Sequence, residues 1–263
     1  MDEWQRVLES STKVDMDNPS PYRDSSVVLK DVSKEFGKTS ALARVTLQFN
    51  SGSTALLGRN GAGKSTLMNL ISGIVLPSDG DIKVGGYAAG SKAACRLLAR
   101  QLEFPGTAGS LTPKRLARLL AMTPKESGDM KMIMGQFEVP DKPMCKLSRG
   151  NQLKLALSVA FARTRPILLL DEPTSGLDAF GVHCLTELIM DRQRQNLVTV
   201  VATHQPTLTP ELFDRAIVID EGRICFDGTL PDLLALAGGE RDGMTPTGKL
   251  AGALASLLQR GSR

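Results

Sequence analysis

A glycine-rich stretch with a single lysine, residues 58–66, is the part of this sequence best suited to chemistry. It fits the phosphate-loop pattern G-x-x-x-x-G-K-[ST], with Gly58, Gly63, Lys64 and Ser65 at the fixed positions. Glycines let the backbone curl so that its N–H groups point at phosphate oxygens. Lys64 supplies a positive charge for the β- and γ-phosphates, and the Ser65 hydroxyl can bind Mg²⁺. The stretch predicts a nucleoside triphosphate site, with a glycine-rich turn that matches by chance as the alternative.

Two carboxylates after a short apolar run form the second chemically suggestive feature. Residues 167–170 are all Ile or Leu and end in Asp171 and Glu172, a pattern typical of a buried parallel strand whose carboxyl end faces a ligand. An Asp there can hold Mg²⁺ through water. The adjacent Glu can orient and partly deprotonate a water that attacks the γ-phosphate. His204 closes the next predicted strand, which places its ring near the γ-phosphate; a purely structural role is the alternative.

The elements that must position these residues alternate between strand and helix patterns. Residues 54–57 are predicted to be the strand that enters the loop, and 64–71 the helix that leaves it, with Gly73 just past the helix end. The phosphates would then lie at the N-terminus of that helix. Further strands are predicted at 197–203 and 216–219 for the core sheet, and at 27–29, 45–49 and 81–84 for a small antiparallel sheet beside it. The pattern indicates an α/β fold with a mostly parallel core sheet.

Residues 102–146 have a different pattern, because turn residues separate short helical stretches such as 114–122. Half of the ten methionines lie in this segment: Met122, Met130, Met132, Met134 and Met144. Methionine fills gaps in thin cores and also lines adaptable binding surfaces, so both a core role and a partner-binding role are open. Ser148 is predicted to cap a helix from about Gln152 to Arg163 that is apolar nearly all round and therefore buried.

Composition limits the class of protein. The chain has 263 residues, 41% hydrophobic and 23% charged, which suits one large domain or two small ones. A net charge of +4 is too weak to indicate nucleic acid binding. No apolar run approaches the roughly 18 residues that span a bilayer, and the N-terminus has no secretory apolar region. Four widely spaced cysteines, Cys95, Cys145, Cys184 and Cys225, predict small buried thiols in a reducing cytosol rather than a disulfide framework.

Together these motifs resemble the ATPase subunit of an ATP-binding cassette (ABC) transporter, over about residues 27–234. Residues 58–66 resemble the Walker A loop, and 167–172 the Walker B strand with Glu172 in the catalytic position. Residues 147–151 match the family signature LSGGQ, and 175–178 match its D-loop. His204 resembles the switch histidine.

Two further positions follow from the resemblance. Phe36 lies where the family places an aromatic ring that stacks on adenine, with an ordinary core aromatic as the alternative. Gln101 is the candidate for a glutamine that touches both Mg²⁺ and the transmembrane partner.

The resemblance implies ATP and Mg²⁺ as cofactors and assigns roles by motif. The ATP-binding residues would be Phe36, Gly58, Asn60, Gly61, Ala62, Gly63, Lys64, Ser65 and Thr66. Mg²⁺ would be held by Ser65, Gln101 and, through water, Asp171, and catalysis would use Glu172, His204 and Gln101. A neighbouring subunit's ATP would meet Ser148, Arg149, Gly150 and Asn151, and Asp178 would contact that neighbour across the dimer.

The resemblance also implies the organisation of the chain and its partners. We expect a P-loop NTPase of ABC type at 26–237, with an antiparallel β-subdomain and an inserted helical subdomain at about 102–150. A flexible N-terminal extension, 1–25, and a C-terminal tail, 238–263, would flank it; the tail would carry a short helix with Leu250, Leu254, Leu257 and Leu258 on one face. The expected partners are an integral membrane permease and a second nucleotide-binding subunit, identical or related, at the cytoplasmic face of the cell membrane.

The signature departs from the common form at two places, with Arg149 for glycine and Asn151 for glutamine. The Arg149 form favours ATPases of small drug, peptide or lipid exporters, so the sequence predicts an ATPase that energises a separate permease, of exporter type. The competing hypothesis is a soluble ABC ATPase that acts in cytosolic macromolecular assembly. No nucleic acid partner is expected.

Overall fold

The structure, a computed structural model, describes residues 25–102, 109–120, 123–204, 212–236, 248, 250 and 252–254. Its centre is a six-stranded sheet in the order β10-β9-β3-β8-β7-β6, in which all neighbours are parallel except the β9–β10 hairpin. The strands are β3 (Gly52–Leu57), β6 (Leu98–Arg100), β7 (Ile167–Asp171), β8 (Val198–Thr203), β9 (Arg215–Asp220) and β10 (Arg223–Gly228). This confirms the predicted α/β class with a mostly parallel core sheet.

Register brings the chemically important strand ends to one edge of this sheet. Leu57 pairs with Thr203, and Asp171 pairs with Ala202. The phosphate loop, the carboxylate pair and His204 therefore leave the sheet at neighbouring points along the same edge, as expected for parallel strands.

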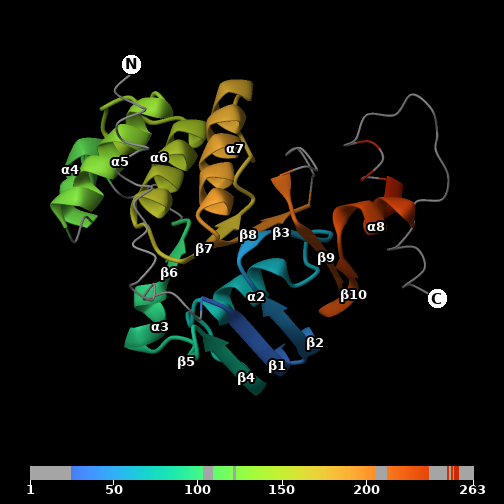
Figure 1. The fold of residues 1–263 in the computed structure, drawn as a ribbon. Helices are drawn as coiled ribbons and strands as arrows, with labels where there is room; N and C mark the ends of the chain where they lie inside the picture. The colour runs from blue at the N-terminus through green and yellow to red at the C-terminus, as the bar shows by residue number, and fades with distance from the viewer. Residues whose placement is uncertain are drawn as a thin grey trace, which may run out of the picture.

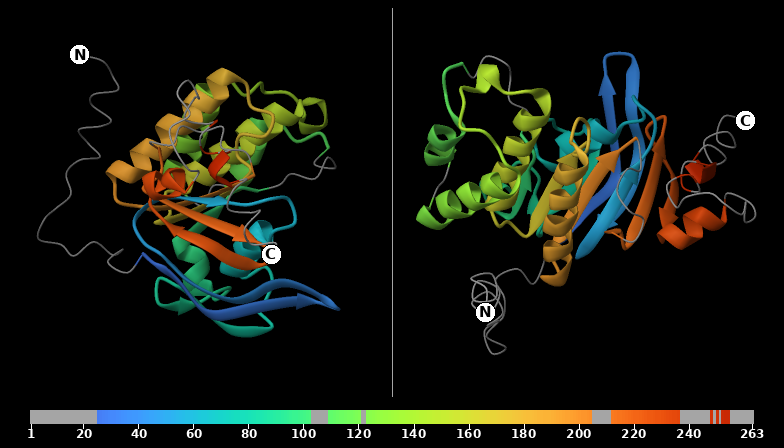
Figure 2. Two further views of the ribbon diagram at one scale, coloured as in Figure 1. Left: turned by 90° about the vertical axis from the view of Figure 1, so that its right-hand side faces the viewer. Right: turned by 90° about the horizontal axis from the view of Figure 1, so that it is seen from above.

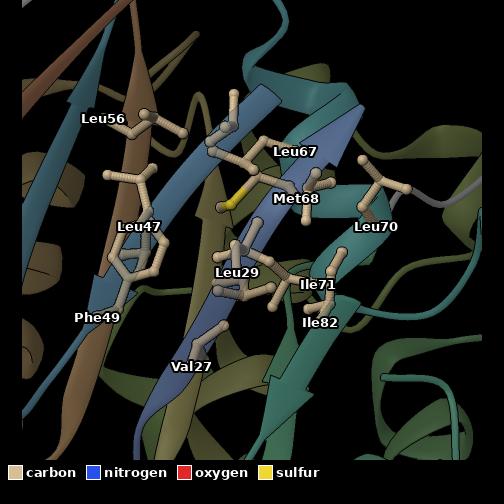
Figure 3. Packing of buried hydrophobic residues seen from close by; sticks show 14 of the residues in the cluster. Val27, Leu29, Leu47, Phe49, Leu56, Leu67, Met68, Leu70, Ile71 and Ile82 are labelled. Carbon is tan, nitrogen blue, oxygen red and sulfur yellow. The ribbon is translucent and has the colours of Figure 1, made fainter. Parts of the chain in front are cut away.

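A four-stranded antiparallel sheet in the order β2-β1-β4-β5 lies beside the core (Figure 1). Its strands are β1 (Val27–Phe36), β2 (Thr39–Phe49), β4 (Asp79–Val84) and β5 (Tyr87–Ala88). Helix α2 (Lys64–Ile71) lies between the two sheets, and Leu67, Met68 and Ile71 point at Leu29 and its neighbours (Figure 3). Burial of these side chains fixes α2, so the phosphate loop at its N-terminus has a rigid support.

The opposite face of the core sheet is covered by α6 (Arg149–Ala162) and α7 (Ala179–Arg194). The helices α4 (Pro113–Leu120), α5 (Pro124–Gln136) and the 3₁₀ turn η1 (Met144–Lys146) pack with α6 at one end of the molecule, and α8 (Leu230–Ala235) lies at the other (Figure 2). The remaining helix, α3 (Lys92–Leu97), precedes β6. The helical group agrees with the expectation for 102–150, although the domain boundaries stay predictions.

One predicted helix limit was wrong. Helix α6 begins at Arg149 rather than Gln152, because the Ser148 side chain accepts a hydrogen bond from the Asn151 N–H and closes the first turn immediately after itself. Helix α4 is described up to Leu120, and the predicted end at Met122 lies outside the described residues.

Among the methionines of 102–146, Met130, Met134 and Met144 are buried in the helical core, which favours gap filling, whereas Met132 is 46% exposed. The cysteine prediction was wrong on burial: all four thiols are free, but Cys95, Cys145 and Cys225 are exposed and Cys184 is partly exposed. Cys225, for example, points outward from strand β10, where exposed and partly buried residues alternate.

Parts of both predicted ends lie outside the described residues. These are 1–24 of the extension and most of the tail, including Leu257 and Leu258. In the tail, Leu250 and Leu254 are buried against α8 and β9, which agrees with packing on the body. Within the described ranges, no helix is both long and apolar enough to span a bilayer.

Candidate nucleotide-binding and hydrolysis site

Close backbone packing explains why glycine is needed at two points of the phosphate loop. A Cβ added at Gly58 would lie 2.3 Å from the carbonyl oxygen of Ile219, and one at Gly63 would lie 2.8 Å from that of Ala41. Gly63 also has a φ of +111°, a conformation that other residues rarely adopt. The loop is therefore held tightly between β9 and β2, with the exposed Asn60 and Gly61 at its turn and buried Ala62 behind them.

The N-terminus of α2 has the properties of an anion site. Its cap residue is Gly63, which makes no side-chain capping bond, and its first turn, which carries Ser65 and Thr66, contains no acidic residue. The positive end of the helix dipole and its first N–H groups therefore meet no anionic side chain of that turn, and such an arrangement favours phosphate oxygens.

Lys64 is buried, with 6% of its side chain exposed, and its ammonium group is held by loop carbonyls. The Nζ donates hydrogen bonds to the oxygens of Gly58, at 2.8 Å, and Arg59, at 3.1 Å, and lies 3.8 Å from Glu172 Oε1. Burial lowers the pKa of Lys64, and the charges of Glu172 and Asp171 oppose that shift. The Lys64 ammonium nitrogen thus lies at the centre of the candidate site, between the loop and the carboxylates.

The three predicted Mg²⁺ ligands are joined by hydrogen bonds to Asp171. Ser65 donates a hydrogen bond to Asp171; burial raises the pKa of Asp171, while that bond and the Arg100 charge act in the opposite direction. Gln101 Nε2 donates to the Asp171 carbonyl oxygen at 3.0 Å, and its buried Oε1 has no hydrogen-bond partner among the described residues. An unpartnered amide oxygen beside a carboxylate and a hydroxyl fits the all-oxygen ligand preference of Mg²⁺.

Glu172 is fixed in position by three donors. Its Oε2 accepts a hydrogen bond from Thr203 Oγ1 at 2.9 Å, and its Oε1 lies 2.9 Å from the His204 backbone nitrogen and 2.7 Å from His204 Nδ1. The sequence predicted that His204 lies near the γ-phosphate but missed its direct contact with Glu172. It also missed Thr203, for which the only signal is its place beside His204 at the strand end.

The Phe36 ring is 51% exposed, so the alternative of a core aromatic is wrong. Phe36 ends β1 and pairs with Thr39 across the hairpin; Lys34 Nζ lies 5.0 Å from its ring centroid. The carbonyl oxygen of Ala41, two residues after Thr39, packs against the backbone at Gly63. The exposed ring therefore belongs to the hairpin that flanks the phosphate loop, and its stacking on adenine stays a prediction.

The signature residues contact the D-loop of the same chain. A Cβ added at Gly150 would lie 2.6 Å from the Gly176 carbonyl oxygen, so α6 and the D-loop touch through backbone. One turn later, Lys154 Nζ lies 3.1 Å from Asp178 Oδ2, while Asp178 Oδ1 accepts from Gly181 N at 2.7 Å and caps α7. The Gly181 amide and Lys154 lower the pKa of Asp178. Ser148 and Arg149 are exposed at the start of α6.

Comparison with known families places this site in context. A model of the family described as ABC transporter matches residues 42–175. A second model, described as an AAA domain and putative AbiEii toxin of a type IV toxin–antitoxin system, matches residues 143–209.

Similar curated proteins include three transporter ATP-binding subunits. A thiamine import ATP-binding protein, ThiQ of Haemophilus ducreyi, is 35% identical over 67% of this chain and 87% of its own length. A phosphonates import ATP-binding protein, PhnC of Rhizobium meliloti, is 30% identical over 80% of this chain and 84% of its own length. An energy-coupling factor transporter ATP-binding protein, EcfA2 of Ligilactobacillus salivarius, is 29% identical over 74% of each chain.

Solved structures agree in fold. The structure of an ATP-binding subunit of an ABC transporter has a TM-score of 0.76 at 24% identity and covers 90% of this chain and 99% of its own. The structure of a bacterial Atm1-family ABC exporter with ATP bound has a TM-score of 0.71 at 20% identity, covering 92% of this chain and 42% of its own. At these identities the likeness concerns the fold alone.

Proposed function

The chain belongs to the ABC transporter family of ATP-binding proteins, and we propose that it binds MgATP on residues 58–66 and hydrolyses it to energise a separate membrane permease. One observation carries the assignment of the site: a single contact network joins the phosphate-loop lysine, Lys64, to Glu172 and through it to His204. A phosphate-binding cation beside a carboxylate that can activate water suits the hydrolysis of a terminal phosphate, and the histidine holds that carboxylate in position.

Each residue has a defined task in this mechanism. The α2 N-terminus and Lys64 hold the phosphates and stabilise the charge that develops on them. Glu172, oriented by Thr203 and His204, accepts a proton from the attacking water, and the His204 ring lies close enough to keep that carboxylate aimed. Ser65, Gln101 and Asp171 are the residues that would hold Mg²⁺, which would supply positive charge to balance the charge of the phosphates.

We propose that the site is completed by a second nucleotide-binding subunit. The N-terminus of α6 is exposed, with the Ser148 hydroxyl and the Arg149 cation at its positive end. Aimed at a neighbour's γ-phosphate, this end would favour closure only while that phosphate is present, so hydrolysis would release the pair.

A permease contact is supported by an apolar surface beside Gln101. A groove of about 220 Å³ is lined there by residues that include Ile71, Ile74, Arg100 and Leu102. Ile74 is 66% exposed, and nearby Leu76 is 70% exposed. Large exposed aliphatic side chains around a groove are typical of a partner surface. We therefore place the permease here and the protein at the cytoplasmic face of the membrane.

The exporter direction predicted from Arg149 gains no support from the relatives, since ThiQ and PhnC are both named import proteins. The proposed function therefore includes no direction of transport. The alternative of a soluble assembly ATPase has no observation of its own in its favour.

Co-purification tests the transport part of the proposal. Tagged protein from detergent-solubilised membranes should retain an integral membrane protein, and Ile74→Glu with Leu76→Glu should reduce its recovery at least tenfold. The matched control is Leu119→Glu, whose side chain is 69% exposed on α4. Recovery with soluble partners only, or equal recovery from both variants, would contradict the permease assignment.

A further inference from the structure

The outer face of α7 carries a groove that the nucleotide chemistry does not use. It has a volume of about 520 Å³ and a mainly apolar lining. Its walls come from the end of α5 and the length of α7 and include Gln136, Phe180, Cys184, Glu187, Leu188 and Arg194, and we call it the α7 groove. Phe180 is 47% exposed there. A half-exposed phenyl ring in an apolar groove with a polar rim is typical of a surface that another segment covers.

We propose that the first residues of this same chain, about 1–14, dock in the α7 groove as an amphipathic helix. Trp4, Val7 and Leu8 have the i, i+3, i+4 spacing of one helix face, and polar residues surround them. These three side chains would cover Phe180 and Leu188. This inference concerns a surface away from the phosphate loop and does not depend on the proposed function.

The place where the described chain begins supports this occupant. Val27, at the start of β1, pairs with Phe49 at the end of β2. Three residues later β3 starts at Gly52, whose N–H donates to the carbonyl oxygen of Leu197, three residues past the end of α7. The described chain therefore starts at the same end of the molecule as the Arg194 end of the α7 groove.

The length of the remaining segment also fits. Residues 15–24 in extended form reach about 33 Å, and Pro19 and Pro21 keep this stretch out of a long helix. Residues 1–14 as a helix would then measure about 21 Å. The stretch of α7 from Phe180 to Arg194 has fourteen residue steps, which is again about 21 Å.

Charge at the rim agrees with a mixed-charge helix. The α7 groove presents Glu187 and the ion pair of Asp191 with Arg194, so its rim carries charges of both signs. The segment carries Arg6 between its apolar positions and Glu9 directly after them. Because Phe180 lies two residues after Asp178, a docked segment would also lie next to the D-loop, where we place the subunit contact.

Tryptophan fluorescence of the full-length chain tests the proposal, because Trp4 is its single tryptophan. We expect blue-shifted emission and weak quenching by acrylamide. Phe180→Ser should move both towards the values of the denaturant-unfolded chain, whereas Leu119→Ser, at an exposed position on α4, should change neither. Emission from the native chain equal to that of the unfolded chain, or no response to Phe180→Ser, would overturn the proposal.

A cross-link provides the second readout and identifies the occupant. Leu8→Cys, in a chain with Cys95, Cys145 and Cys225 replaced by Ser, should form an intramolecular disulfide with Cys184 on mild oxidation. Cys184→Ser should abolish it, which controls for folding and oxidation. A disulfide found only between two chains would assign the α7 groove to a second copy and contradict the proposal. Neither readout involves ATP, so a negative result would not contradict the proposed nucleotide site.

Discussion

Glu172 adopts a backbone conformation that is unusual for a glutamate. Its φ is +47°, and such left-handed geometry in a non-glycine residue costs about 1–3 kcal/mol. The bond from its N–H to the Ala202 carbonyl oxygen, at 2.8 Å, and the three donors on its carboxylate maintain this geometry. The carboxylate thereby turns out of the strand towards Lys64, where a base for water would act.

Replacing Glu172 by Gln should separate binding from hydrolysis. The amide has nearly the same shape but no longer takes a proton, so we expect ATP affinity to stay within about twofold and turnover to fall at least about 100-fold. Filter binding and phosphate release measure the two quantities. Glu187→Gln on the surface of α7 is the matched control, and unchanged turnover in Glu172→Gln would remove this residue from the catalytic role.

Replacing Lys64 by Ala should weaken the binding of ATP itself. The loss of one charged contact to the phosphates should weaken ATP binding by about 10- to 100-fold. Titration with a fluorescent ATP analogue measures this, and Lys83→Ala, exposed on β4, is the control. Equal affinity of the Lys64→Ala and wild-type proteins would show that the phosphate loop is wrongly assigned.

At the scale of the elements, α6 and the D-loop form one unit through Gly150, Gly176 and the Lys154–Asp178 ion pair. Gly150→Ala places a methyl group against the Gly176 carbonyl oxygen and should displace the D-loop. We expect hydrolysis to fall about tenfold or more while ATP binding to the dilute protein is retained. Gly128→Ala in α5, where a Cβ meets open space, should leave both unchanged. Full activity of Gly150→Ala would separate the D-loop from turnover.

Helix α7 is attached to the sheet by a buried cation. Arg192 donates to Thr199 Oγ1 and to the carbonyl oxygens of Arg165, Pro166 and Val198 at 3.0–3.3 Å. Arg192→Met removes these donors from a buried site, so we expect the free energy of unfolding to fall by about 3 kcal/mol. Urea unfolding measures it, with exposed Arg194→Met as the control. A change below about 0.5 kcal/mol would show that the carbonyls find other partners.

At the scale of the whole molecule, local motifs were predicted well and contacts between distant segments were not. The bounds of α2 follow from the Gly63-Lys64 junction, and the core strand β7 from its apolar run. The Glu172–His204 contact, and the Gln101 Oε1 that has no partner within the described part of the chain, depend on how β6, β7 and β8 align, which sequence spacing does not specify. The sequence prediction left out the first three residues of α6, which follow the cap Ser148. These residues are polar or small and show no apolar periodicity.

The most direct measurement is a crystal structure of the Glu172→Gln protein with MgATP. The account predicts the triphosphate on the N-terminus of α2, with Lys64 Nζ on the phosphates and Gln101 Oε1 on the cation. A triphosphate bound elsewhere in the molecule, with residues 58–66 unoccupied, would contradict it.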